Sequence, residues 1–148
     1  MERNAKLVKC NVCGQPIWID QYGNGDECQN CGWRQSEESA DHPNVAGILN
    51  IPSLNSARKL YKQGKPLIAD FNDFIEAYES YGELEFTYKQ IRYGIWEEKG
   101  AIVLHERETG KTIGLYKNID DFKNNSKING ILLKDLWAFV ENTDFLQG

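Results

Sequence analysis

Two short cysteine motifs near the N-terminus constrain this chain more than any other feature of its sequence. The segments CNVCG and CQNCG each hold two cysteines with two residues between them, followed by a glycine, and fourteen residues lie between Cys13 of the first motif and Cys28 of the second. Two intervening residues let the backbone turn tightly enough for both sulfurs of a motif to reach one ion. The motifs contain all four cysteines of the chain, which are Cys10, Cys13, Cys28 and Cys31.

Four thiolates from two facing motifs form a tetrahedron, which suits a structural zinc ion with Zn–S bonds of about 2.3 Å. The segment between the motifs, residues 20–27, has two glycines and an asparagine and is typical of a hairpin tip. Ile17, Trp18 and Ile19 are expected to form the first strand of this hairpin, and Trp33 to cover its apolar face. The sequence therefore predicts a zinc ribbon whose ligands are the four cysteines.

Two other roles for the cysteines fit the sequence less well. A thioredoxin-like redox site has a strand–helix context and a single reactive pair, whereas here two pairs flank a glycine-rich hairpin. A catalytic zinc site keeps one position open, but four cysteines fill a tetrahedral coordination sphere. His42 and His105 lack motif spacing, and we expect them in an exposed loop and in a strand. A closed structural metal site is the favoured interpretation.

The order of these motifs resembles the bacterial cysteine-rich CPCC-type domain, in which CxxCG, a hairpin and CxxCGW precede a Ser-Leu-x-x-Ala-Arg helix. Here CNVCG and CQNCGW supply the motifs, and SLNSARKLYKQG, residues 53–64, resembles the helix. The chain departs from the family at Val12 and Asn30, where prolines are usual, and at Arg34, where acidic residues are usual. The resemblance covers about the first 64 residues. It implies a small zinc-binding module, sometimes associated with toxin–immunity loci, without an established enzyme activity.

The remainder of the chain predicts helices followed by a sheet. Helices are expected over residues 53–64, with Ser53 as the N-cap, and over residues 70–82, because apolar side chains recur there at helical spacing. The following segments alternate apolar and polar residues, and short glycine-containing turns join them, which predicts a four-stranded antiparallel meander. A short helix that begins after Asn118 and a last helix over residues 131–142 follow. The predicted strands are ELEFTYK, IRYGIWEE, AIVLHER and KTIGLYK.

We therefore expect an α+β protein with an N-terminal four-cysteine zinc ribbon, helices, a four-stranded antiparallel β-meander and C-terminal helices. Two domains are expected. Residues 1–66 would form the ribbon with its trailing helix, and residues 67–148 a small α+β domain. Residues 36–52, which contain two prolines, are expected to form a connector that folds back onto the ribbon.

The charge balance and the length of the apolar runs indicate which classes of partner the chain is expected to bind. The chain has 17 Lys and Arg against 22 Asp and Glu, a net charge of −5, whereas phosphate binding needs clustered positive charge. Nucleic acid is therefore the less favoured partner. No apolar run reaches the ~18 residues that span a membrane, and the N-terminal segment lacks the apolar core of a signal peptide. We expect a cytoplasmic protein with no membrane association, in which the thiols stay reduced.

Charged residues gather in two of the predicted helices. Arg58, Lys59, Lys62 and Lys65 lie toward the end of the first, where a solvated face that complements the helix dipole is favoured over an anion-binding patch. The acidic face of the second is usually solvated as well, but a cluster of this size could meet a basic protein partner. The candidate partner-binding residues are Asp73, Glu76, Glu79, Glu83 and Glu85.

The sequence favours a non-catalytic protein, since it contains no nucleophile elbow, P-loop, zincin or dinucleotide fingerprint. We expect a zinc-binding protein that binds and inhibits a bacterial protein partner, as an immunity protein does, and no small-molecule substrate is evident. Two alternatives stay open. In the first, the chain is a nucleic-acid-binding accessory protein, and Trp18 or Trp33 would stack on bases beside nearby cations. In the second, the chain is an enzyme, and two carboxylates located on the sheet would perform acid–base chemistry. The cations are Arg3, Lys6, Lys9 and Arg34.

Overall fold

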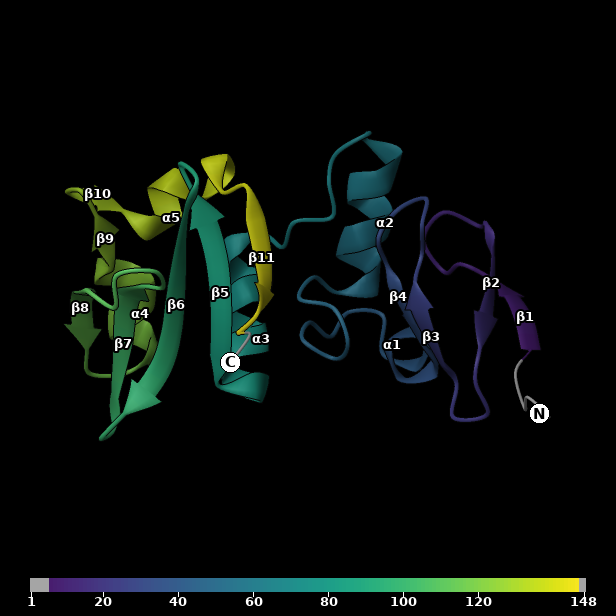
Figure 1. Cartoon of the computed structure of the whole chain (residues 1–148), viewed down its shortest axis with the longest axis horizontal. Coiled ribbons are helices and arrows are strands. Elements are labelled where there is room, and N and C mark those ends of the chain that lie inside the picture. The colour runs from purple at the N-terminus through teal and green to yellow at the C-terminus, as the bar shows by residue number, and fades with distance from the viewer. Residues whose placement is uncertain (1–5, 147–148) are drawn as a thin grey trace. The chain divides into compact units, whose positions relative to one another are not determined.

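The structure is a computed structural model that describes residues 6–146 (Figure 1). Backbone contacts divide the chain into a unit that ends at Ala69 and a unit that begins at Asp70. The sequence predicts a division three residues earlier, after residue 66. Each unit has its own sheet and its own helices, so the chain belongs to the α+β class. Within residues 6–146, no helix is both long enough and apolar enough to cross a membrane.

The first unit is built on a four-stranded antiparallel sheet in the order β1-β2-β3-β4. Asp20 shapes the turn between β2 and β3, because its carboxylate accepts hydrogen bonds from the backbone N–H groups of Tyr22 and Asn24 at 2.8 and 3.1 Å. The turn is therefore shorter than the hairpin tip expected over residues 20–27. The strands are β1 (Lys6–Lys9), β2 (Pro16–Ile19), β3 (Asn24–Glu27) and β4 (Arg34–Ser36).

Two helices follow this sheet in the first unit. The short helix α1 (Glu37–Asp41) was not expected, and it begins because the Ser36 hydroxyl accepts a hydrogen bond from the backbone of Ser39 at 3.2 Å. The second helix, α2 (Leu54–Lys62), begins after the predicted N-cap Ser53. The expected helix over residues 53–64 therefore forms, with ends that differ by one or two residues.

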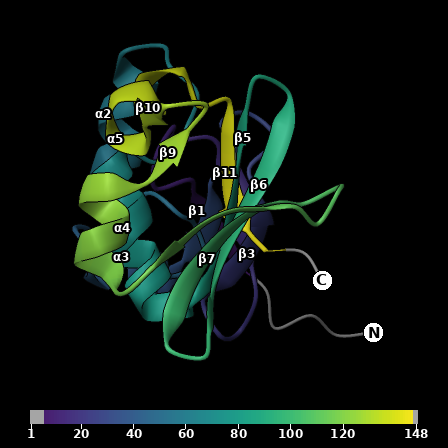
Figure 2. The ribbon, with the colours of Figure 1, turned by 90° about the vertical axis from the view of Figure 1, so that its left-hand side faces the viewer.

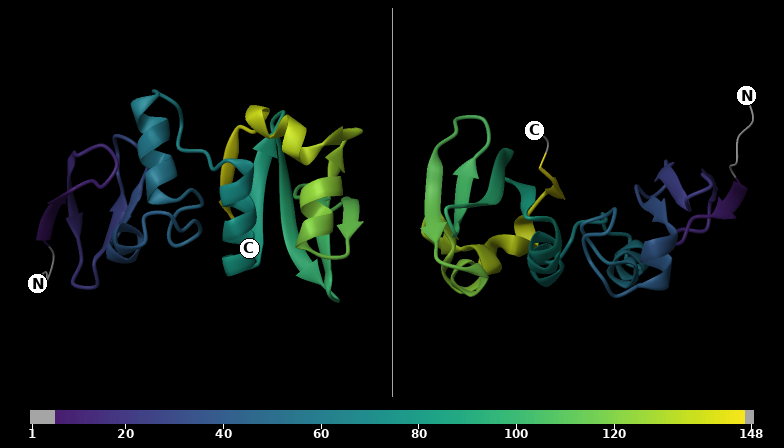
Figure 3. Two further views of the ribbon diagram at one scale, coloured as in Figure 1. Left: turned by 180° about the vertical axis from the view of Figure 1, so that it is seen from behind. Right: turned by 90° about the horizontal axis from the view of Figure 1, so that it is seen from below.

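The second unit contains a five-stranded antiparallel sheet in the order β11-β5-β6-β7-β8. Its helices lie on one face of this sheet (Figures 2 and 3). A two-stranded ribbon, β9 with β10, precedes the last short helices. The elements are α3 (Phe71–Tyr81), β5 (Glu83–Tyr88), β6 (Ile91–Glu98), β7 (Ala101–Glu106), β8 (Thr112–Tyr116), α4 (Ile119–Asn125), β9 (Lys127–Ile128), β10 (Ile131–Leu132), α5 (Leu133–Leu136), the 3₁₀ helix η1 (Trp137–Phe139) and β11 (Asn142–Phe145).

An aromatic cluster forms the core of the second unit. The Phe74 ring of α3 meets the Phe86 ring of β5 edge to face, with centroids 5.8 Å apart. The Trp137 ring lies 4.7 Å from Phe74 and 5.2 Å from Phe86. Such tilted aromatic contacts each contribute about 0.5–1.5 kcal/mol beyond the burial of their area. The cluster therefore joins α3, the sheet and the C-terminal segment.

The C-terminal segment differs from the expected helix over residues 131–142, and the sheet has five strands where four were expected. Leu133, Leu136, Trp137 and Val140 are buried at helical spacing. The helical structure ends at Phe139, however, and the chain then extends as β11, which pairs with the edge of β5. Pairing satisfies backbone groups that an unpaired edge strand would leave exposed, and a local apolar period does not reveal it.

Candidate metal centre

Two backbone turns with the same hydrogen bonds hold the four cysteines. In the first, the N–H of Cys10 donates to the Gln15 oxygen at 2.7 Å, and the N–H of Gly14 donates to the Cys10 oxygen at 2.9 Å. In the second, Cys28 and Gly32 make the equivalent bonds at 2.8 and 2.7 Å. The two glycines have φ angles of +81° and +85°, a conformation that a Cβ atom disfavours. The glycine of each CxxCG motif therefore closes its turn.

The four sulfurs lie together at one end of the sheet. All four Sγ atoms are within 4.8 Å of one another, and the Cys10–Cys31 and Cys13–Cys28 distances are both 3.6 Å. A tetrahedron with metal–sulfur bonds of about 2.3 Å has edges of about 3.8 Å. The arrangement therefore fits a metal ion held by four thiolates.

The electrostatics of the thiols also favour a bound cation. Burial raises the pKa of Cys13, but hydrogen bonds, first that with Asn30, outweigh burial and lower this pKa to about 7. Burial, and the interaction with Cys10, raise the pKa of Cys31. Neighbouring thiolates that repel one another ionise at different pH values, and a bound cation removes this repulsion.

A buried glutamine supports the first metal-binding turn. Gln35, which is 2% exposed, donates through Nε2 to the Cys10 sulfur at 3.1 Å. Its Oε1 accepts from the backbone N–H of Asn11 at 3.0 Å. Hydrogen bonds of this kind orient metal ligands. The spacing of the cysteines did not reveal this role of Gln35; a polar residue on the buried face of a strand beside the second motif is the signal that could have indicated it.

The helix α2 packs directly on the cysteine site. Leu54 and Ala57 of α2 belong to one buried cluster with Cys10, Cys28 and Trp33. Trp33 is 1% exposed, so it covers the apolar side of the ribbon as expected. This burial also excludes Trp33 as a stacking surface for bases.

Two hydrogen bonds tie α2 to the metal-binding turns. The Nε atom of Arg58 donates to the backbone oxygen of Asn11 in the first turn at 2.8 Å. The side-chain amide of Asn30, in the second turn, donates to the Tyr61 hydroxyl at 3.2 Å. The position of α2 therefore depends on the turns that hold the cysteines.

The predicted acidic partner-binding residues separate into exposed and buried ones. Glu79 and Glu83 are exposed, and Asp73 and Glu76 of α3 are partly exposed. Glu85 does not belong to this surface, because its side chain is only 9% exposed and its Oε2 atom lies 3.4 Å from Arg107 Nε. The alternation of apolar and polar residues in this strand predicts an exposed Glu85 side chain. The sequence does not show that Arg107, which is distant along the chain, pairs with it.

Glu97, which the sequence pattern did not single out, lies next to this surface. Burial raises the pKa of Tyr78 to about 12, and the charges of Glu97 and then Glu83 add to the effect. Two carboxylates from neighbouring strands therefore lie near the same tyrosine. We call Glu79, Glu83 and Glu97 the acidic end of the second unit; all three are exposed.

Neither histidine contributes to the cysteine cluster. His42 is exposed at the end of α1, whereas His105 is 4% exposed in β7. The His105 ring lies 3.6 Å from the Trp96 ring, centroid to centroid, and burial lowers the pKa of this histidine. A Cβ atom on Gly94 would lie 2.7 Å from His105 Nε2, so the imidazole is packed over the glycine of the adjacent strand.

Comparisons with known proteins add no relative. A scan of protein-family models, a search of curated proteins and a search of solved structures each found no match. What the chain does must therefore be inferred from its residues. Those residues form a four-cysteine site with the geometry of a metal centre, on an N-terminal four-stranded antiparallel sheet similar to a zinc ribbon.

Proposed function

We propose that the four cysteines bind a structural zinc ion and that the chain is not an enzyme. Zinc favours four thiolates in a tetrahedron, and such a site leaves no position for a substrate or a reactive water. The 3.6 Å separations of the paired sulfurs support this assignment. The metal would hold the ribbon and α2 together, and the CPCC-type resemblance also implies a zinc-binding module.

We further propose that the chain binds and inhibits a basic bacterial protein through the acidic end of its second unit. The observation that carries this proposal is the segregation of charge. Residues 70–148 contain 15 Asp and Glu against 9 Lys and Arg, whereas residues 1–69 contain 7 against 8. Within residues 6–146, no carboxylate of the acidic end lies in an ion pair. Exposed charge of one sign attracts a partner of the opposite sign and speeds association.

The test begins with the partner and then addresses the surface. The tagged full chain captures proteins from a lysate of the native host, mass spectrometry identifies them, and each purified candidate is tested for direct binding. Replacement of Glu79, Glu83 and Glu97 by lysine should slow association at least about tenfold and remove most of its salt dependence. The control variant carries lysine at Asp26, Asp41 and Asp135, which are exposed acidic residues elsewhere. Equal association rates for the two variants would remove the acidic end from the proposal.

The alternative of a nucleic-acid module has weaker support. Trp18 is 59% exposed and pairs across the strands with Leu7, which is 56% exposed, so the ribbon does present an aromatic surface. The hollow of about 380 Å³ beside Trp18 also contains Asp26 and Glu27, whose carboxylates repel phosphate. Titration with a fluorescent single-stranded oligonucleotide at low salt tests this alternative. Binding that falls when Trp18 is replaced by alanine would favour it over the protein partner.

A further inference from the structure

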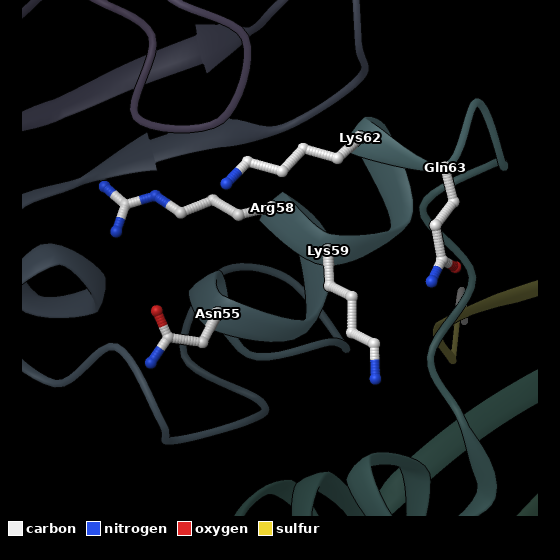
Figure 4. A pocket seen from close by; sticks show the side chains of 5 residues that line it. All are labelled: Asn55, Arg58, Lys59, Lys62 and Gln63. Atoms are coloured by element: carbon white, nitrogen blue, oxygen red, sulfur yellow. The ribbon is translucent and has the colours of Figure 1, made fainter.

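A hollow of about 500 Å³ borders the surface of α2 (Figure 4). The other residues that line it lie three, four, seven and eight positions after Asn55, so the lining residues form one stripe along the helix. This stripe is distinct from the side of α2 that buries Leu54 and Ala57. All of them are exposed, and the acidic end contributes none of them. The lining residues are Asn55, Arg58, Lys59, Lys62 and Gln63.

The hollow lies in a part of the chain that has no negative charge. Residues 42–69 contain four Lys and Arg and no Asp or Glu, although the whole chain has a net charge of −5. Three of the four cations line the hollow. Like charges three and four residues apart on a helix destabilise it, and a bound anion relieves that repulsion.

The guanidinium of Arg58 is held in place by the metal-binding turn. Its Nε hydrogen is used in the 2.8 Å bond to the Asn11 oxygen, and a guanidinium has four further N–H donors on its terminal nitrogens. These terminal donors form a planar fork that matches two oxygens of one anionic group. In Figure 4 the Arg58 and Lys62 side chains leave the helix in the same direction. The guanidinium of Arg58 and the ammonium group of Lys62 therefore lie on the same side of the helix.

We propose that this hollow binds a compact anion that carries two or more phosphate groups. Three cations and two side-chain amides match the density of charge and of acceptor oxygens in linked phosphates. A volume of about 500 Å³ is within the range of small-ligand sites. A compact ligand is favoured because, at physiological salt, an anionic group more than about 8 Å from the cations of the hollow is largely screened from them.

Calorimetry of the metal-loaded full chain with tripolyphosphate, at about 20 mM salt, tests the proposal. Replacement of Arg58 and Lys62 by alanine should weaken binding at least about tenfold. Replacement of Lys111 and Lys134 by alanine removes the same charge from exposed positions in the second unit and should leave binding unchanged. Arg58→Lys keeps the charge but loses the fork, so binding should fall to an intermediate value.

Phosphates bind zinc, so cobalt-loaded protein serves as a control. Its thiolate absorption band should persist through the titration, which would show that the anion has not removed the metal. Absence of binding at low salt, or equal binding by the Arg58→Ala/Lys62→Ala variant, would overturn the proposal. Tighter binding of a single-stranded oligonucleotide of about twelve nucleotides would assign the hollow to nucleic acid and overturn the compact ligand. None of these results tests the separate proposal that the acidic end binds a basic protein.

Discussion

Gln35 donates a hydrogen bond from its side-chain amide to the Cys10 sulfur across 3.1 Å, and both residues are buried. The other end of the same amide accepts from the Asn11 backbone. One side chain thus connects a strand of the sheet to the turn that holds the first cysteine pair. It donates to a sulfur that would carry negative charge when a metal is bound.

The first prediction concerns this glutamine. Gln35→Leu removes both hydrogen bonds while it keeps most of the side-chain volume, so the affinity for zinc should fall about 10–100-fold. Competition with a chromophoric chelator measures the change. Gln29→Leu, at an exposed position in the second turn, is the matched control and should bind zinc like the parent. An unchanged affinity in Gln35→Leu would show that the sulfur needs no such support.

The second prediction concerns the loss of the metal. Chelation, or Cys28→Ser, should unfold the first unit because its sheet has little apolar core apart from the cluster around the cysteines. The second unit, whose core is the Phe74, Phe86 and Trp137 cluster, should keep its fold. Backbone NMR spectra of the full chain distinguish the two units residue by residue. Spectra of residues 6–69 that stay dispersed without metal would contradict this prediction.

The third prediction concerns the buried carboxylate of Glu85. Removal of one partner leaves the other charge buried, so Glu85→Leu should destabilise the second unit by roughly 2–4 kcal/mol, less than a fully buried pair because Arg107 is partly exposed. Replacement of both Glu85 and Arg107 by leucine should cost less than the sum of the single changes. Urea unfolding, followed by the NMR amide signals of the second unit, measures each variant, because the four tryptophans of the chain lie in both units. Strict additivity would mean that the two side chains do not interact.

The fourth prediction concerns His105 and pH. Burial lowers the pKa of this imidazole in the folded state, so the unfolded chain binds a proton at a higher pH than the folded chain does. Stability should therefore be complete above the ordinary histidine pKa of about 6.5 and should fall as the pH drops from there toward the lowered value.

Hydrogen exchange of the β6 and β7 amides at pH 7.5 and 5.5 can follow this loss of stability separately from the protonation of the cysteines. His105→Gln should remove most of the pH dependence in these strands. The control is His42→Gln, which changes the exposed histidine and should leave the pH dependence as it is. Equal pH dependence in the parent and in His105→Gln would assign the effect to another group.

The features that could be predicted from the sequence are those set by neighbouring residues. The spacing of Cys10 and Cys13 and the glycine that follows describe one complete turn, because the backbone hydrogen bonds that close it lie within six residues. The helix α2 was likewise predictable, since Ser53 caps it and its apolar residues recur every three or four positions.

The features that the sequence did not reveal depend on residues far apart in the chain. Glu85 alternates with apolar neighbours as an exposed residue would, but its carboxylate pairs with Arg92 and Arg107, seven and twenty-two positions later. The helical period of Leu133, Leu136 and Val140 is genuine, but the strand that follows is stabilised by pairing with β5. A period within one segment carries no information about a partner strand elsewhere.

The pairing of β11 with β5 has a consequence for biosynthesis. Phe145 and Leu84 are directly opposite each other, although sixty-one positions separate them along the chain. A ribosome adds about 5–20 residues per second, so β5 waits several seconds for its neighbour after it leaves the exit tunnel. The cysteine-bearing turns, by contrast, are complete by residue 33 and can capture metal while translation continues. A nascent chain would thus acquire its N-terminal unit early and protect the edge of its second sheet only as the last strand emerges.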